Sequence, residues 1–521
     1  MILEEIIGSF VSLFSSLIAQ TPPISSVTQQ RDCCLLFEAN SEREDAYDGL
    51  IHREYEQERS AELPYYEQNV SYSSLFPAHD EQTGKNFCAS FVRSCKANLG
   101  LVTAVIFILG LLTAGLVYVD LNTTNACIEW MHNNFTVPSN IRIVRIVGMA
   151  VTLIPLYVWF PVCIVMLWGF RQFKQNYLLR LVACQSITLS SCMLYKTLAF
   201  DNSKVTANVQ NRLPGNGIFI VSILCGAYLV ARKIKQVNQA VSYGVLRIFF
   251  MLSFSFLGIC LIAYIYAYVI VEYFTATGSK IKKAIIAAIT PGVAIPVTAI
   301  AKYIVLRKST QIIAPDRAFL LCSSVRGGSI VLYRTMQSGF QNIWLFIGLS
   351  LIHGVSNVLS KATLNFRIKM WTHLVKAFNR TSCCRTKLQV QPLRSPRIRR
   401  LNADLEIQNI LYEYTGVILS QAYLACYLVM SFDVSPWHVI KESLMRIAIG
   451  LAIDFLFNIV SVFIQIHFYD IPMRKVWSNY WPRHVTANAF VCICIVSYFS
   501  ASLVGIFASR KYMSMFKESK L

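Results

Sequence analysis

Three ionisable residues inside long apolar stretches are the candidates for chemistry in this sequence. Arg326 lies in the middle of the stretch 318–340, His353 lies in the next apolar stretch, and Asp454 lies in a third. A charged side chain deep in a membrane helix costs about 2.5–3.5 kcal/mol on insertion scales, so it normally has a partner or a function. Arg326 and His353 both fall roughly 10–12 Å from the expected cytoplasmic ends of their helices. We expect the three residues to line a substrate path or to form a buried ion pair.

Each of these residues also has a structural interpretation. Arg326 and Asp454 can form a purely structural ion pair, or the arginine can extend toward the membrane surface. A lone histidine such as His353 can be a core residue with satisfied hydrogen bonds. An Arg326–Asp454 pair is geometrically possible and would explain how a helix with a central arginine is tolerated.

Two proline-bearing stretches are further candidates for a binding site. Pro155 and Pro161 lie in one of them, and Pro291, Gly292 and Pro296 lie in the other. A proline inside a helix removes a backbone hydrogen bond, and many transporters bind substrate at interrupted helices. These residues are therefore candidate helix breaks, although ordinary proline kinks are the favoured interpretation.

Signatures of enzymes do not occur in the sequence. It contains no phosphate-binding glycine loop, no HExxH, no nucleophile elbow and no paired catalytic carboxylates. The 16 cysteines lie mostly in apolar stretches, where cysteine behaves as a small hydrophobe, and no Cys/His spacing predicts zinc. The sequence therefore predicts a protein that is not an enzyme and that has no cofactor and no metal.

The elements that must position these residues are membrane helices. Of the 521 residues, 55% are hydrophobic and 15% are charged, and the mean hydropathy is +0.48. Soluble domains carry about 25% charged residues, and their helices have a polar face. The apolar stretches here have none, as lipid requires. We predict an all-α, polytopic integral membrane helix bundle with about 11 transmembrane helices, within a range of 10 to 12.

Charge is unevenly distributed along the chain, whose formal net charge is +20. Residues 1–97 hold 15 of the 28 acidic residues but 7 of the 48 basic residues. The other basic residues lie mostly in short loops, as is typical of cytoplasmic loops beside anionic lipid headgroups. The expected partners are the lipid bilayer and, at the basic loop 361–408, anionic headgroups. Nucleic acid is not expected, and the oligomeric state is not predicted.

The N-terminal region is predicted to be cytoplasmic. Residues 1–20 begin with acidic residues and have helical apolar spacing, which favours an amphipathic interfacial helix over a signal peptide. Residues 21–97 are acidic and lack sustained periodicity, so we expect them to be mostly disordered. Short dileucine-type and tyrosine-type matches there suggest cytoplasmic sorting or signalling proteins as partners.

Positive charge and glycosylation sequons orient the helices. The first span, 98–120, follows Arg93 and Lys96, and the next loop has no Lys or Arg but carries the sequons of Asn122 and Asn134. Both features place the N-terminus inside and this loop outside.

The stretch 318–337 determines the side on which the last third of the chain lies. If it spans the membrane, the eleven Lys and Arg residues of loop 361–408 lie inside, as the charge bias requires. We therefore count it as a span. The predicted order is transmembrane helices 1–8 in 98–360, a basic cytoplasmic loop in 361–408, helices 9–11 in 409–509 and a short basic tail in 510–521.

Ten or more spans with interrupted helices and buried ionisable residues favour a multi-pass transporter or channel-like protein that moves a small solute or ion. A chemoreceptor-like receptor is an alternative, with the N-terminal region and the basic loop as docking surfaces. A non-transporting membrane scaffold or a lipid-handling protein is another. The expected location is the plasma membrane or an endomembrane.

Overall fold

The computed structural model describes residues 87–132, 139–201, 213–237, 241, 243–307, 312–313, 316–381, 396–432 and 435–508. The expected surface helix 1–20, the sequon of Asn134 and the tail 510–521 lie outside the described residues. All regular elements within these ranges are helices, which confirms the all-α prediction. They are α4 (Phe87–Ala104), the π-helical η1 (Val105–Leu109), α5 (Gly110–His132), α6 (Ser139–Trp168), α7 (Phe170–Asn176), α8 (Leu178–Asp201), α9 (Leu213–Val237), α10 (Val245–Ile265), the π-helical η3 (Tyr266–Ile270), α11 (Val271–Ala276), α12 (Lys280–Val293), α13 (Ile295–Arg307), α14 (Leu320–Ser338), α15 (Ile343–Ala362), α16 (Leu364–Thr381), α17 (Pro396–Phe432), α18 (Pro436–Tyr469) and α19 (Met473–Ala508).

The chain divides into two units. One comprises residues 1–80 and 371–390, and the other comprises residues 81–370 and 391–521. Within the first unit the structure describes residues 371–381, which form the C-terminal part of α16. All residues of the candidate site belong to the second unit.

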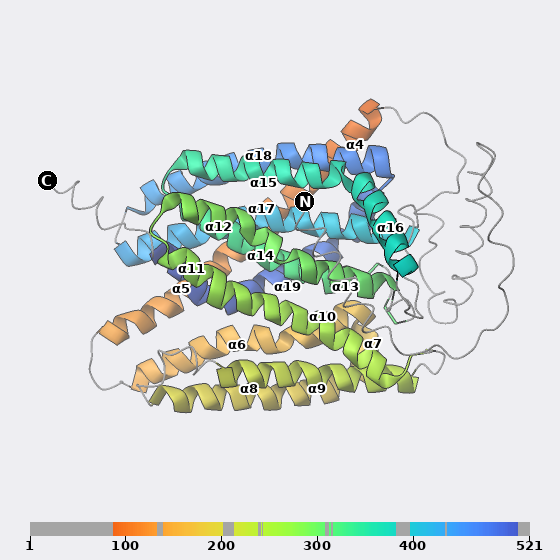
Figure 1. Cartoon of the computed structure of the whole chain (residues 1–521). Coiled ribbons are helices and arrows are strands. Elements are labelled where there is room, and N and C mark those ends of the chain that lie inside the picture. The colour runs from red at the N-terminus through yellow and green to blue at the C-terminus, as the bar shows by residue number, and fades with distance from the viewer. Residues whose placement is uncertain are drawn as a thin grey trace, which may run out of the picture. The chain divides into compact units, whose positions relative to one another are not determined.

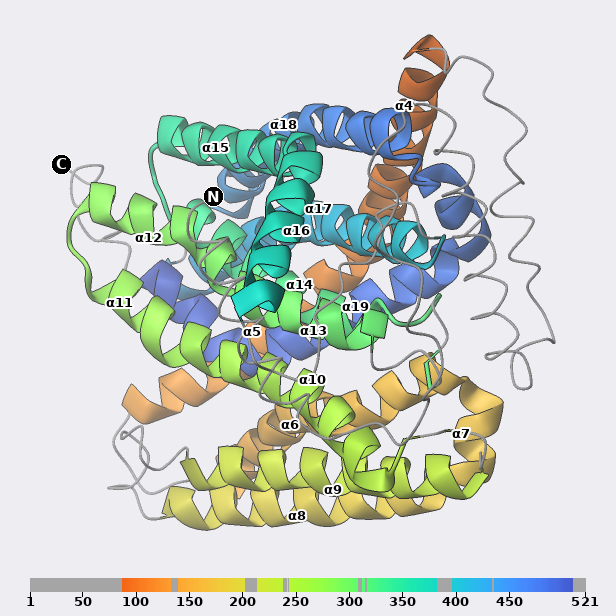
Figure 2. The same cartoon turned by 45° about the vertical axis from the view of Figure 1, so that its right-hand side comes forward.

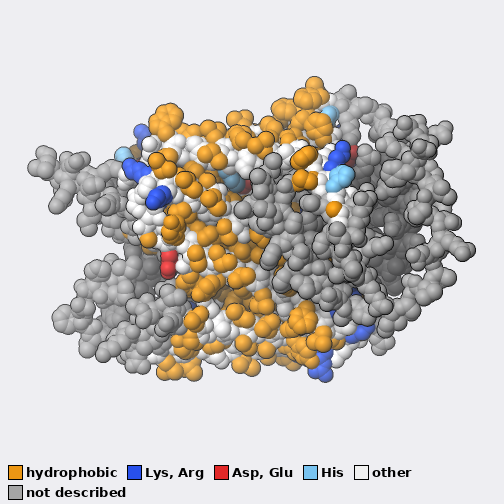
Figure 3. All heavy atoms as spheres, in the orientation of Figure 1, with side chains coloured by type: hydrophobic (Ala, Val, Ile, Leu, Met, Phe, Trp, Pro, Cys, Tyr) orange, Lys and Arg blue, Asp and Glu red, His pale blue; other side chains and the backbone are white. Residues whose placement is uncertain are grey.

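Eight helical stretches of the described residues are long and apolar enough to cross a membrane. They are Phe87–Leu121, Ile146–Trp168, Leu178–Leu198, Leu213–Val237, Val245–Ala276, Lys280–Leu306, Ile343–Ala362 and Pro436–Tyr469. Large apolar side chains on them are exposed, among them Phe107, Leu111 and Leu179 at 69%, 72% and 83%. Figure 3 shows hydrophobic side chains in a band across one face, with Lys and Arg at its edges. This arrangement fits a multi-pass membrane protein, because lipid requires an apolar band of this kind.

Three further long helices, α14, α17 and α19, are more polar and lie deeper in the bundle. In α14, 18 of the 19 residues are buried, and the exception is Arg326. None of the described side chains of α17 is exposed. α14 packs against α17, α12, α13 and α19, and α17 also packs against α5, α18 and α19; Figures 1 and 2 show α14 and α17 between the surrounding helices. Because protein surrounds them, these helices can carry polar side chains that lipid would not tolerate.

Apolar packing forms two main clusters in this unit. One joins α14, α17 and α19 to η3 and α12, and it includes Tyr333, Met336 and Tyr423. The other joins α6, α9 and α10, where Phe160 and Phe256 meet edge to face at 4.8 Å between ring centroids. α8 and α9 lie side by side next to α6 (Figures 1 and 2). The polar residues of the candidate site lie on α14, α15, α17 and α18.

The two proline-bearing stretches differ. α6 continues through Pro155 and Pro161, so these two candidate positions are not breaks and both prolines are accommodated inside one helix. The second stretch is interrupted only at Ala294, between the end of α12 at Val293 and the start of α13 at Ile295; Pro291 lies inside α12, and the backbone of Ala294 keeps α-helical angles. The hydroxyl of Tyr266, at the start of η3, donates to the carbonyl of Thr290 at 2.8 Å. This bond satisfies a carbonyl beside the break.

Helices extend into two segments that the sequence suggests are loops. α5 continues to His132, so the backbone of Asn122 is helical. In the segment 361–408, α16 occupies 364–381 and α17 begins at Pro396. α17 is therefore a 37-residue helix, and its first turns belong to the predicted basic loop.

Candidate functional site

A buried ion pair links α14 to α18. The Nη2 atom of Arg334 lies 2.6 Å from both carboxylate oxygens of Asp454, and the two side chains are 1% and 2% exposed. Asp454 therefore has an arginine partner, but the expected Arg326–Asp454 pair is wrong. Arg326 lies eight residues earlier on α14, about 12 Å away along the helix axis, and only Arg334 reaches the carboxylate.

Neutral polar groups surround Arg334. Its Nη1 atom donates to Oε1 of Gln337 at 2.9 Å and lies 3.4 Å from Oγ of Ser350. The Nε2 atom of Gln337 donates to Ser350 Oγ and to the carbonyl of Phe346, both at 2.6 Å. These bonds fix the guanidinium between α14 and α15, so it cannot turn to another anion without breaking them.

His353 brings a second carboxylate into the site. Its Nε2 atom lies 3.4 Å from Oε1 of Glu413 on α17, and its ring stacks on Tyr333 with 4.9 Å between centroids. Glu413 also accepts from Nδ2 of Asn409 at 2.9 Å and from Nδ2 of Asn357 at 3.5 Å. Glu413 is 3% exposed, so these partners replace the water that a carboxylate would otherwise bind.

Lys361 and Glu406 form a third pair, between the last turn of α15 and α17. Oγ of Ser461 on α18 donates to the other oxygen of Glu406 at 3.1 Å. Lys361 is 16% exposed, about as much as His353 at 15%, whereas Arg334 is fully buried.

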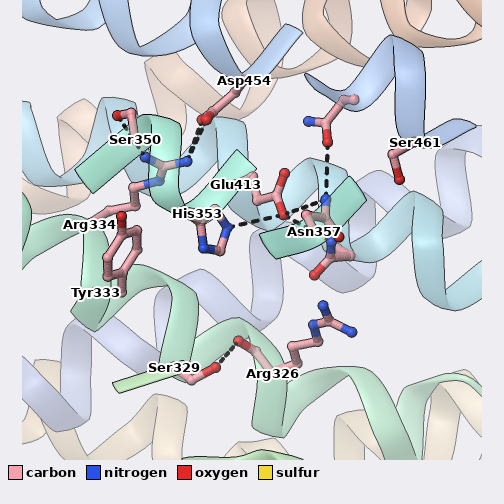
Figure 4. A network of polar contacts seen from close by, with 12 residues as sticks. Arg326, Ser329, Tyr333, Arg334, Ser350, His353, Asn357, Glu413, Asp454 and Ser461 are labelled. Atoms are coloured by element: carbon pink, nitrogen blue, oxygen red, sulfur yellow. Dashed lines mark hydrogen bonds and ion pairs between the residues drawn. The ribbon is translucent and has the colours of Figure 1, made fainter. Parts of the chain in front are cut away.

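Helical spacing places these groups in one seam between three helices. Residues at intervals of three or four share a face of a helix. Together with Arg334, they are called here the polar ladder: Ser350, His353, Asn357 and Lys361 of α15; Glu406, Asn409 and Glu413 of α17; and Asp454, Asn458 and Ser461 of α18. From residue 350 to residue 361 it extends for about 16 Å. Figure 4 shows Arg334 with Asp454 and His353 with Glu413 side by side.

Glycines let the helices of the ladder approach closely. A Cβ atom at Gly354 on α15 would lie 2.3 Å from Cδ2 of Phe457 on α18, and one at Gly450 on α18 would lie 3.1 Å from Cγ1 of Val417. Larger residues would force these helices apart and separate the polar groups.

Arg326 lies beside the ladder and is not bonded to it. Its guanidinium has no hydrogen-bond or ion-pair partner among the described residues, while its carbonyl accepts from Ser329 Oγ at 2.7 Å. The side chain extends from α14 toward the part of the ladder that carries Asn357 (Figure 4). Of the three residues expected from the sequence, the structure places His353 and Asp454 in the ladder and Arg326 next to it.

Two smaller buried polar groups lie elsewhere in the bundle. On α17 and α19, Asp404 accepts from Nε of Arg400 at 2.9 Å and lies 3.2 Å from Nε2 of His484. Farther along the same helices, Asp120 of α5 accepts from the hydroxyls of Tyr423 at 2.7 Å and Ser500 at 2.6 Å. Both groups hold α17 in place and contain no exposed side chain.

Most residues of the ladder were not among the sequence-based candidates. The signal that could have found them is the recurrence of polar residues every three or four positions in α15, α17 and α18. Glu413 and Arg334 were overlooked because single charged residues near the ends of expected spans do not lower the apolar character of a long stretch.

No group of three or more His, Cys, Asp or Glu side chains in the described part of the chain is placed to hold a metal ion. Comparisons of the chain with protein-family models, with curated proteins and with solved structures found no significant match. The polar ladder and Arg326 are therefore the features of the molecule that bear on its function.

Proposed function

We propose that the protein is a multi-pass membrane transporter whose substrate path runs along the polar ladder. The supporting observation is the ladder itself, a line of ionisable and amide side chains between α15, α17 and α18 in an otherwise apolar bundle. Burying three carboxylates with three basic partners is expensive in a membrane protein, and such groups commonly line solute or proton paths. On this proposal the protein is not an enzyme.

The proposed topology has eleven spans. The eight apolar stretches are joined by α14, α17 and α19, whose polar side chains are enclosed by other helices and so need not meet lipid. The acidic N-terminal region and the basic segment 361–408 then lie in the cytoplasm.

The basic segment is proposed to bind anionic lipid headgroups. In α16 the basic residues Arg367, Lys369, Lys376 and Arg380 alternate with apolar ones. This composition suits a helix lying in the membrane interface.

The interrupted helix α12–α13 supports the proposal. It packs against α14, the helix that carries Arg334 and Arg326. Interrupted helices beside a substrate site are common in transporters, because a break lets part of a helix move.

Flux measurements on the full chain in liposomes test the function. Small anionic, cationic and zwitterionic solutes are screened on one wild-type preparation, and each flux found is measured again with Glu413→Gln. We expect Glu413→Gln to lower the flux at least tenfold, because the substitution removes the charge at the centre of the ladder. Glu442→Gln is the matched control, since Glu442 is on α18 but outside the ladder and 41% exposed. A flux that is equal in wild type and Glu413→Gln, or no flux of any solute in folded protein, would contradict the proposal.

A further inference from the structure

Arg326 is the single exposed residue of α14, although Val325 and Gly327 beside it are buried. Its guanidinium has no partner among the described residues. The three carboxylates of the ladder already have basic partners: Asp454 has Arg334, Glu413 has His353, and Glu406 has Lys361. A guanidinium held inside a helix bundle favours an anion, and its planar fork matches a carboxylate or a phosphate.

Packing places Arg326 near the turns of α17 that carry Asn409 and Glu413. A Cβ atom at Gly327 would lie 2.8 Å from Cε1 and Cζ of Tyr412, the residue directly before Glu413 on α17. The ring of Tyr412 therefore packs directly against the backbone of α14 at Gly327. Arg326 therefore lies one residue from this contact, beside the ladder.

The register with α15 places Arg326 on the Lys361 side of Glu413. Tyr333 of α14 stacks on His353 of α15. Arg326 lies seven residues before Tyr333, about 10 Å along the axis, and α15 returns antiparallel, so Arg326 is level with the turn that follows Asn357. Figure 4 shows its side chain reaching toward Asn357.

Two buried acceptors belong to the turns of α15 and α17 near this level. The Oδ1 atoms of Asn357 and Asn409 are buried and accept no hydrogen bond from the described residues. The Nδ2 atoms of both residues donate to Glu413, which leaves the oxygens for another donor. A buried acceptor without a donor is unfavourable, so these oxygens favour a ligand with N–H or O–H groups.

We propose that Arg326, Asn357 and Asn409 form a site for a zwitterionic ligand. Its carboxylate or phosphate would pair with Arg326, and its ammonium group would donate to the amide oxygens of Asn357 and Asn409. The inference rests on the proposed function, for which it names the substrate class. An amino acid and a phosphatidylethanolamine headgroup share this chemistry, so the test has a soluble arm and a lipid arm.

Binding is measured directly, independently of flux. The full chain is placed in phosphatidylcholine nanodiscs and titrated by calorimetry with glycine, acetate and ethylamine. Glycine carries both charged groups and should bind more tightly than either of the other two, which carry one each. In the lipid arm, the thermal unfolding midpoint is compared between nanodiscs with and without phosphatidylethanolamine.

The test uses variants of Arg326. Its guanidinium has no partner among the described residues, so these substitutions should not unfold the protein. Arg326→Gln should weaken binding of glycine and acetate about tenfold or more and leave ethylamine unchanged. Arg326→Lys keeps the charge and should retain part of the affinity. Arg180→Gln, at an exposed arginine of α8, is the matched control and should bind as the wild type does.

The outcomes separate the site from the transport function. Arg326-dependent binding of glycine supports a soluble ligand, and an Arg326-dependent rise of the midpoint with phosphatidylethanolamine supports a lipid headgroup. No response in either arm, or the same response in Arg326→Gln, overturns the site. If the protein binds glycine through Arg326 but moves no solute, the proposed site is supported and only the proposed transport function is contradicted.

Discussion

Arg334 and Asp454, 120 residues apart in the chain, form the most deeply buried ion pair of the ladder, with one guanidinium nitrogen 2.6 Å from both carboxylate oxygens. The pair fixes α18 against α14 and α15 at the end of the ladder farthest from Lys361. Its position makes it first of all a structural element, whereas the guanidinium of Arg326 has no partner among the described residues.

The first prediction concerns this pair. Removing one charge leaves the other buried without compensation, which costs about 3–5 kcal/mol in comparable pairs. Arg334→Gln and Asp454→Asn should therefore each lower the thermal unfolding midpoint strongly in detergent. The double variant is neutral and should recover more than half of the loss. Arg326→Gln is the control and should change stability by less than about 0.5 kcal/mol. Equal losses in all four variants would exclude a specific Arg334–Asp454 interaction.

The second prediction tests the close approach of α15 and α18. The Cβ atom of Gly354→Ala would lie 2.3 Å from Phe457, so the helices must separate, at a cost of about 1–3 kcal/mol. Gly348→Ala on the same helix meets nothing within 4 Å and should be neutral or slightly stabilising, since alanine favours helices. Unfolding midpoints of the two variants provide the measurement. A Gly354→Ala protein as stable as Gly348→Ala would show that α15 and α18 are not in contact there.

Much of the fold could be predicted from the sequence because lipid imposes a simple rule: a helix that faces it must be long and apolar, without a polar face. The eight stretches that can cross a membrane coincide with eight of the expected spans. The rule fails for α14, α17 and α19, whose surroundings are other helices. For α14 the positive charge of 361–408 supplied the argument for a span, although the helix is polar throughout its middle.

The site was predictable only in part, because partners depend on tertiary packing. The burial of Asp454 implied a basic partner, but the choice between Arg326 and Arg334 depends on how far α14 is shifted along α18, and no local pattern encodes that. Glu406 and Lys361 lie in the predicted cytoplasmic loop or at its edge. The long, continuous α17 places Glu406 inside the bundle instead.

The third prediction concerns the topology. With the first outer loop and the inner basic segment as proposed, an N-glycan should be attached at Asn122 or Asn134 and not at Asn379 of α16. The shift in mobility on glycosidase treatment should disappear in the Asn122→Gln/Asn134→Gln variant and persist in Asn379→Gln. Modification of Asn379 would instead place α16 outside, and the spans that follow it would have to be reversed.

The fourth prediction concerns the break between α12 and α13. Tyr266→Phe removes the hydrogen bond to the Thr290 carbonyl and leaves a buried acceptor without its donor, which costs about 1–3 kcal/mol. The loss should appear as a lower unfolding midpoint and as faster hydrogen exchange in α12 and α13. Tyr228→Phe, at an exposed tyrosine of α9, should change neither quantity. Faster exchange spread over the whole bundle would indicate global destabilisation and contradict a local role at the break.

The fifth prediction uses the neighbouring glycines 327 and 328, which differ only in what lies beside them. A Cβ atom at Gly327 would lie 2.8 Å from the ring of Tyr412, whereas one at Gly328 meets nothing within 4 Å. Gly327→Ala should therefore push α14 away from α17, cost about 1–3 kcal/mol and displace Arg326 relative to Asn409. Gly328→Ala should be neutral or slightly stabilising. Because Arg326 precedes the clash by one residue, Gly327→Ala should also weaken glycine binding, and Tyr412→Leu in the same protein should partly restore it by making room for the methyl group. If Gly327→Ala lowers stability but leaves binding intact, the position of Arg326 does not depend on the packing of α14 against α17.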